Sequence, residues 1–270
     1  MRTKDIFDGV EDTLYIPLIA RIYVSERFPK FFYDDKALSL KQYIPKDYIE
    51  KNADEYFNMA SVCRQYVIDK KVTAFIKNHN KSNVVFLGSG LETSYNRIGN
   101  THDNFYHIDL PNVIEQRKNL LGNAENEVLI AEDMFSLDWL KEIDLSLPTI
   151  ITVSGVYQYF DESRVVAMIR DMRALIPNAD LVFDATNSTG LKYANKYVRQ
   201  TGNKNACMYF CIDNAKRFAD MTGTELISVS GFYAEALKHC RGLRLKTIIY
   251  MFFSDTLNRT KVLHLSLNQP

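Results

Sequence analysis

The sequence has no excess of charge of either sign, because Lys with Arg and Asp with Glu each number 33 among 270 residues. Such a chain has no general attraction for nucleic acid or for an acidic membrane, although this leaves a local patch open. Long hydrophobic runs are missing too: apolar stretches reach about ten residues, whereas a bilayer span needs roughly 20. The first residues, MRTKDIFDGVEDT, lack the apolar segment of a signal peptide. We therefore expect a soluble, cytoplasmic protein that binds neither nucleic acid nor membranes.

Cysteine is scarce, and the four residues are scattered at Cys63, Cys207, Cys211 and Cys240. A chain of this length can bury a large core without disulfide bonds, and such cysteines suit a reducing compartment. Cys207 and Cys211 have the spacing of one helix face, but no second ligand pair follows at the spacing of a zinc finger. We expect core thiols and no metal site.

The chain changes its hydrophobic pattern near Lys81. From Thr13 to about Lys77, apolar residues recur every three or four positions, which is typical of amphipathic helices. Beyond Lys81, short β-branched runs alternate with helix-like sequence, which favours a mostly parallel, doubly wound α/β sheet. The predicted strands are Val84–Leu87, Phe105–Ile108, Glu127–Ala131, Thr149–Val153 and Leu181–Asp184.

Further elements follow these strands. DESRVVAMIRDMRALI predicts a helix that begins at Asp161, because acidic residues open it and Pro177 follows it. Residues of about 186–218 predict a helical insertion, and the runs TELISVSGF and LKTIIYMFF predict two late strands. We expect a single domain over 1–270, with a helical cap at 1–81 and an α/β core at 82–270.

A glycine-broken turn follows the first predicted strand. Gly88 and Gly90 allow a ligand to approach the backbone, and the helix that starts near Glu92 offers free N–H groups to an anion. The dinucleotide fingerprint requires a third glycine where this chain has Thr93. The turn therefore indicates a nucleotide-like ligand without identifying it.

Carboxylates end the next two strands. Asp109 can accept hydrogen bonds from both ribose hydroxyls, as in NAD and S-adenosylmethionine sites, or it can cap the helix after Pro111. Asp133 and Met134 follow the third strand, where a carboxylate and a backbone N–H can contact adenine; the alternative is a solvated acidic loop.

Four segments in this order resemble the leucine carboxyl methyltransferase and polyketide O-methyltransferase family of class I S-adenosylmethionine-dependent enzymes. They are VVFLGSGLETSYNRI, YHIDLPNVIEQRKNLL, LIAEDMFSLDWL and LPTIITVSGVYQYFDESRVVAMI. The resemblance covers roughly residues 60–185 well. It implies a Rossmann-like seven-stranded sheet with a late antiparallel strand, S-adenosylmethionine as cofactor, and methyl transfer to a hydroxyl or carboxylate of a small molecule.

The resemblance also implies roles for individual residues. Arg64 resembles the arginine that binds the cofactor carboxylate, Asp109 the ribose acceptor, and Asp133 with Met134 the adenine contacts. The remaining expected cofactor contacts are Gly88, Gly90, Leu110 and Ser154. The alternative for Arg64 is a surface helix arginine paired with a nearby acid such as Asp69. Trp139 matches a family tryptophan, for which we expect a packing role.

Two departures from the family pattern bear on activity. The family usually has aspartate and arginine where this chain has Glu92 and Ser94, and an acidic residue before the glycine of Ser154-Gly155. The second departure borders the expected acceptor site, so it leaves the acceptor unidentified and activity in question.

A hydroxyl acceptor would benefit from a general base, whereas a carboxylate needs none. The candidate bases are His107 and Tyr157, for each of which packing is the favoured alternative. An aromatic acceptor lining is expected from Tyr193, Tyr197, Tyr209 and Phe210.

Three other functions stay open: a cofactor-binding protein without transferase activity, a protein carboxyl methyltransferase, and an NAD-dependent oxidoreductase. The sequence does not predict the oligomeric state.

Overall fold

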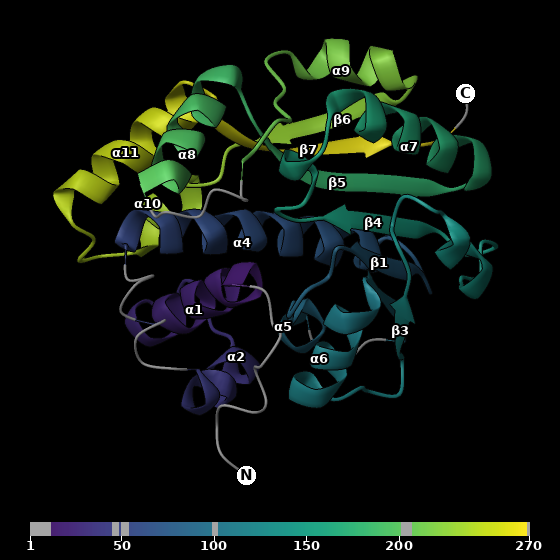
Figure 1. Cartoon of the computed structure of the whole chain (residues 1–270), viewed down its shortest axis with the longest axis horizontal. Coiled ribbons are helices and arrows are strands. Elements are labelled where there is room, and N and C mark those ends of the chain that lie inside the picture. The colour runs from purple at the N-terminus through teal and green to yellow at the C-terminus, as the bar shows by residue number, and fades with distance from the viewer. Residues whose placement is uncertain (1–11, 45–48, 50–53, 99–101, 201–206, 269–270) are drawn as a thin grey trace.

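The computed structural model describes residues 12–44, 49, 54–98, 102–200 and 207–268 (Figure 1). Its centre is a seven-stranded sheet in the order β3-β2-β1-β4-β5-β7-β6, in which β7 runs antiparallel to both of its neighbours. The strands are β1 (Asn83–Leu87), β2 (Asn104–Asp109), β3 (Glu127–Ala131), β4 (Thr149–Val153), β5 (Ala179–Thr186), β6 (Glu225–Ser230) and β7 (Thr260–Ser266). The mostly parallel, doubly wound sheet with a late antiparallel strand confirms the predicted fold class.

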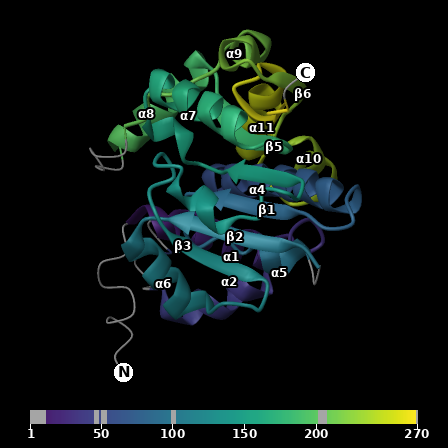
Figure 2. The ribbon, with the colours of Figure 1, turned by 90° about the vertical axis from the view of Figure 1, so that its right-hand side faces the viewer.

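Helices cover both faces of this sheet, as its buried parallel strands require. One face packs against α4, and the other packs against α7 and α9 (Figures 1 and 2). The first face carries α1 (Asp12–Arg27), α4 (Glu55–Lys77), α10 (Ala234–His239) and α11 (Leu245–Thr256), with α2 (Asp35–Leu40) packed on α1. The remaining helices are α5 (Ser94–Ile98), α6 (Pro111–Leu121), α7 (Glu162–Leu175), α8 (Ser188–Gln200) and α9 (Ala215–Thr222), with short 3-10 turns η1 (Lys41–Tyr43), η2 (Asp138–Glu142) and η3 (Tyr157–Tyr159).

Strand β1 shows why the two faces differ in their partners. All five of its residues are buried, and successive side chains point to opposite faces. Val84 and Phe86 join the cluster beneath α4, whereas Val85 and Leu87 join the cluster beneath α7.

Helix α7 confirms the helix predicted at Asp161, which is its N-cap residue.

The late part of the chain corrects one prediction. TELISVSGF contains strand β6, as expected, but LKTIIYMFF forms helix α11 instead of a strand. A continuous apolar run has neither a clear period of two nor of 3.6 residues, so it does not distinguish a strand from a helix. The last strand is β7, which the sequence analysis missed.

The cysteines also differ from expectation in two respects. Residues 207–212 form no helix, so Cys207 and Cys211 do not share a helix face. None of the four cysteines forms a disulfide; Cys63 and Cys240 are buried as expected, whereas Cys207 and Cys211 are only partly buried and are not core thiols. Over the described ranges, no cluster of three or more His, Cys, Asp or Glu residues could hold a metal ion. Within the same ranges, no helix has the length and apolar character needed to cross a bilayer.

Candidate functional site

The parallel strands end at one edge of the sheet, where α/β folds bind their ligands. The register pairs Leu87 at the end of β1 with Ile108 of β2 and Val153 of β4. Val153 is in turn paired with Phe183 of β5, and Asp109 is paired with Ala131 of β3. The candidate residues that follow these strand ends therefore line a single edge.

The turn after β1 requires its two glycines. Gly88 and Gly90 have φ angles of +64° and +48°, a region that side chains with a Cβ disfavour. A Cβ on Gly88 would lie 2.6 Å from Cγ2 of Val156, so the close approach of the β4 loop excludes a larger residue. The turn is held to β2, because the N–H groups of Gly88 and Ser89 donate to the carbonyl of Ile108.

Asp109 is fixed in this turn by two backbone donors. Its Oδ2 accepts from the Gly90 N–H at 2.7 Å, and its Oδ1 accepts from the Leu110 N–H at 2.8 Å. The N-cap residue of α6 is Leu110, which has no side-chain capping bond. The helix-capping alternative for Asp109 therefore finds no support, and the Leu110 side chain is exposed beside the carboxylate.

Arg64 lies on α4 and points at the end of β4 and β5. Its Nη1 is 3.5 Å from Oδ2 of Asp184, whose Oδ1 accepts from the Gly155 N–H at 2.5 Å. Gly155 has a φ of +72°, and a Cβ there would lie 2.7 Å from Nη1 of Arg64. Arg64 therefore pairs with an acid, as the alternative expected, but the acid is Asp184, and Asp69 is held by the guanidinium of Arg97.

Asp184 is a site residue that was not predicted from the sequence. The available signal was its position at the end of the fifth predicted strand, opposite the Ser154-Gly155 pair that lacks the usual acid. The Ser154 hydroxyl donates to Oε1 of Gln65 at 3.2 Å, so the serine contacts α4. A carboxylate thus reaches this strand end from β5 instead of β4.

Asp133 and Met134 lie on the loop after β3. Asp133 is half exposed; its Oδ1 accepts from the Phe135 N–H at 2.9 Å, and its Oδ2 lies 3.6 Å from Nη2 of Arg164. Met134 is buried, and its carbonyl accepts from Nε1 of Trp139 at 2.9 Å. Trp139 is fully buried, which agrees with the packing role expected for it and fixes the position of this loop.

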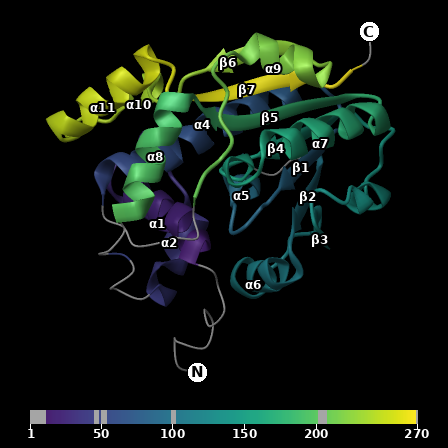
Figure 3. The same ribbon diagram turned by 45° about the horizontal axis from the view of Figure 1, so that its top comes forward.

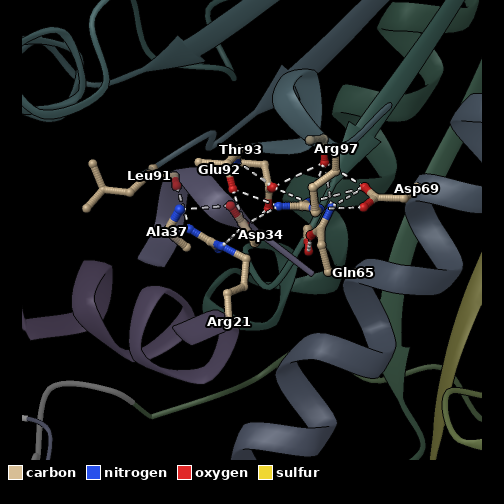
Figure 4. A network of polar contacts seen from close by, with 12 residues as sticks. Arg21, Asp34, Ala37, Gln65, Asp69, Leu91, Glu92, Thr93 and Arg97 are labelled. Carbon is tan, nitrogen blue, oxygen red and sulfur yellow. Dashed lines mark hydrogen bonds and ion pairs between the residues drawn. The ribbon is translucent and has the colours of Figure 1, made fainter. Parts of the chain in front are cut away.

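A buried polar network joins the N-terminal helices to the turn after β1 (Figure 4). Arg97 on α5 is its centre. The guanidinium contacts Asp34 at 2.7 Å through Nη1, Asp69 at 2.8 Å through Nε, and Glu92 at 2.6 Å through Nη2. Arg21 on α1 adds a second guanidinium, which lies 3.1 Å from Asp34 and donates to the carbonyl of Leu91 at 2.6 Å.

Both residues of the first departure from the family pattern belong to this network. Burial raises the pKa of Glu92, but the charges of Arg97 and Arg21 outweigh it and hold that pKa well below its usual range. The Ser94 hydroxyl donates to Asp69 at 2.6 Å and accepts from Gln65 at 2.9 Å. The network thus connects the helical cap, helix α4 and the glycine turn.

Neither candidate base, His107 nor Tyr157, presents an exposed side chain at this edge of the sheet. His107 is fully buried, with Nε2 at 2.9 Å from Glu127 and 3.1 Å from Nη2 of Arg117. Burial and the charge of Arg117 lower its pKa to about 4. Tyr157 is also buried; its ring packs on Phe183, its hydroxyl has no partner among the described residues, and burial raises its pKa. These contacts favour packing for both.

The aromatic residues expected to line the acceptor site lie in different environments. Phe210 is buried among Phe183 and Phe218, so it belongs to the core rather than to an open pocket. Tyr193 and Tyr209 are exposed. The side chain of Tyr197 lies outside the described residues.

Comparisons with known proteins agree with this fold. The leucine carboxyl methyltransferase family model matches residues 17–173. The chain is 24% identical over 198 residues to the tetracenomycin polyketide synthesis O-methyltransferase TcmP of Streptomyces glaucescens, covering 72% of this chain and 73% of that protein.

Solved structures show the same architecture at low identity. A duf574 family protein from Streptomyces avermitilis is 14% identical, with a TM-score of 0.59 over 92% of this chain and 96% of the other. Magnesium protoporphyrin IX methyltransferase from Synechocystis, with bound S-adenosylhomocysteine, is 10% identical, with a TM-score of 0.51 over 79% and 87%.

The family match covers more than half of the chain and sets the NAD-dependent oxidoreductase interpretation aside. S-adenosylmethionine is the cofactor of this family, as predicted. The chain therefore belongs to the leucine carboxyl methyltransferase family and is an S-adenosylmethionine-dependent methyltransferase.

Proposed function

We propose that the chain is an O-methyltransferase that methylates a hydroxyl or carboxylate oxygen of a small molecule by in-line displacement. The observation that carries the site assignment is the meeting of Arg64, Asp184 and Gly155 at the strand edge that also holds Asp109. The printed function of the relative TcmP, a polyketide O-methyltransferase, supports a small-molecule acceptor.

The strand ends of β4 and β5 fit the amino-acid part of S-adenosylmethionine. Nε of Arg64 is buried and has no hydrogen-bond partner among the described residues, so a ligand carboxylate would satisfy it. Asp184 beside it supplies an acceptor for an ammonium group. Gly155 leaves room for the guanidinium, because a Cβ would occupy its place.

The strand ends of β2 and β3 fit the nucleoside part. Two backbone N–H groups orient the Asp109 carboxylate at the end of β2, where a carboxylate can accept hydrogen bonds from the ribose hydroxyls. Leu110 offers apolar surface next to it, and Asp133 with Met134 is assigned to the adenine. When bound, the cofactor supplies a methyl group on a positively charged sulfur.

The contacts of the candidate bases favour an acceptor that is already ionised. His107 is enclosed by Glu127 and Arg117, and Tyr157 is buried with a raised pKa, so neither is suited to take a proton from an acceptor. An anionic oxygen needs no base. The protein then contributes alignment of the acceptor and exclusion of water. We infer that the acceptor is a carboxylate or an acidic phenol or enol.

The test combines cofactor binding with an acceptor panel. Isothermal titration with S-adenosylhomocysteine compares the wild type with Arg64→Met and with Arg217→Met, a control on the exposed side of α9. We expect about 10-fold or greater loss of affinity in R64M alone, because a charge-assisted contact is lost. Unchanged affinity in R64M would refute the site assignment.

The acceptor class is tested by methyl transfer from S-adenosylmethionine to matched carboxylic acids, acidic phenols and aliphatic alcohols. We expect turnover with the first two, at a rate that levels off above the pKa of the acceptor. Turnover restricted to aliphatic alcohols would contradict the proposed mechanism, because such acceptors require a base.

A further inference from the structure

Helix α11 has an apolar surface that the described residues do not cover. Thr247, Met251 and Ser254 form a narrow buried stripe on its inner side. The large apolar residues around the rest of the helix are between 37% and 72% exposed; they are Leu245, Ile248, Ile249, Tyr250, Phe252, Phe253 and, just beyond the helix, Leu257. A surface helix normally carries polar residues opposite its buried stripe, and contiguous apolar patches of this kind mark interaction sites.

The position of α11 makes this surface accessible. The helix contacts α10, α4 and β7 on its inner side. In Figures 1 and 3 it lies at the periphery of the molecule, on the side away from α6. At 100° per residue, the seven apolar residues span an arc of about 200° centred near Ile249 and opposite the buried stripe. A partner can therefore approach the helix directly.

The size of the patch is that of a two-fold interface. Seven large side chains that are about half exposed offer on the order of 100 Å² each, or about 700 Å² per copy. Two such patches bury about 1,400 Å² together, above the roughly 1,000 Å² expected of a specific interface. Two-fold symmetry pairs one patch with itself, so no second surface is needed.

We propose that α11 forms the centre of a symmetric interface between two copies of this chain, with the two α11 helices packed antiparallel. The charges favour this orientation. Arg244 and Lys246 lie at the N-terminal end of α11, and antiparallel packing brings them toward the C-terminal end of the other helix, which carries negative partial charge.

The same surface is less suited to a lipid bilayer. Helices that lie in a membrane interface carry Lys and Arg along their polar face. From Thr247 to Asn258 the sequence has no Lys or Arg, and the polar residues of α11 that face inward are packed against the protein. The second copy is therefore the favoured occupant.

Sedimentation velocity of the full chain between about 1 and 100 µM tests the proposal. We expect a dimer for the wild type and a monomer for the double variant Ile249→Glu/Phe253→Glu. The matched control Leu175→Glu, an exposed apolar residue at the end of α7, should stay dimeric. S-adenosylhomocysteine binding reports folding of each variant and does not depend on the interface.

A second variant keeps the test decisive if the double variant does not fold. Ile249→Cys lies at the centre of the arc and should give a disulfide-linked dimer under mild oxidation, whereas Leu175→Cys should not. A wild type that stays monomeric at 100 µM, or a dimer that persists in the folded double variant, would overturn the proposal. So would a monomer that cosediments with phosphatidylglycerol vesicles, which would assign α11 to a lipid surface.

Discussion

Replacing Gly155 with alanine should displace Arg64, the residue proposed to bind the cofactor carboxylate, with little further effect on the fold. The new Cβ would lie 2.7 Å from Nη1 and 2.8 Å from Nη2 of Arg64. These atoms end a flexible side chain, so the guanidinium can move aside. Its displacement removes charge-assisted hydrogen bonds to the proposed ligand carboxylate worth about 1.5–3 kcal/mol, which corresponds to about 10- to 150-fold weaker binding of S-adenosylhomocysteine. The φ of +72° adds a backbone cost of about 1–2 kcal/mol to stability.

Gly223→Ala is the matched control for this variant. Gly223 also has a φ of +72°, but a Cβ there would approach Arg173 no closer than 3.7 Å. Both variants should therefore lose similar stability in urea denaturation, whereas only Gly155→Ala should lose affinity in calorimetric titration. If Gly155→Ala bound S-adenosylhomocysteine as tightly as Gly223→Ala does, the assignment of Arg64 to the cofactor carboxylate would be wrong.

Three other substitutions probe the buried polar groups. Arg97→Met leaves the buried Asp34 and the largely buried Asp69 and Glu92 without their central cation, so the free energy of unfolding in urea should fall by about 3–5 kcal/mol; a loss no larger than that of Arg217→Met would contradict the network. His107 has a folded-state pKa of about 4, below its ordinary 6.5, so the stability it contributes is present above pH 6.5 and is lost as the pH falls toward 4. Relative to His107→Gln, the wild type should lose up to about 3 kcal/mol over that range, and parallel pH profiles of the two proteins would refute this. Tyr157→Phe removes a buried hydroxyl without a described partner, so thermal unfolding should show a gain of about 1 kcal/mol with unchanged kcat; a large fall in kcat would instead identify Tyr157 as the base.

Local sequence patterns predicted most of the fold. Strands β1 to β5 are short β-branched runs between turn residues, and they lie where the sequence indicates. The error concerns α11 and β7, where composition alone does not distinguish a helix from a strand. The run LKTIIYMFF has strand-like composition, but α11 buries only a narrow stripe of it against the protein.

The candidate site was predictable where its contacts are local in sequence. The glycine turn and Asp109 lie within about twenty residues of each other. They are joined by a hydrogen bond from the Gly90 N–H to the carboxylate that ends β2. The acidic partner of Arg64, Asp184, is 120 residues away, and the most distant partner of Arg97, Asp34, is 63 residues away. Such pairs depend on strand order and helix placement, which no single segment encodes.

Strand β7 follows β6 in the chain but lies between β5 and β6 in the sheet. Asp184 belongs to β5, and its backbone partner is Val262 of β7. During synthesis on the ribosome, β5 therefore lacks its outer neighbour until residues 260–266 have left the exit tunnel. A nascent chain would form the glycine turn early, yet the pair of strand ends that carries Asp184 and Gly155 would be complete only when this late strand pairs with β5.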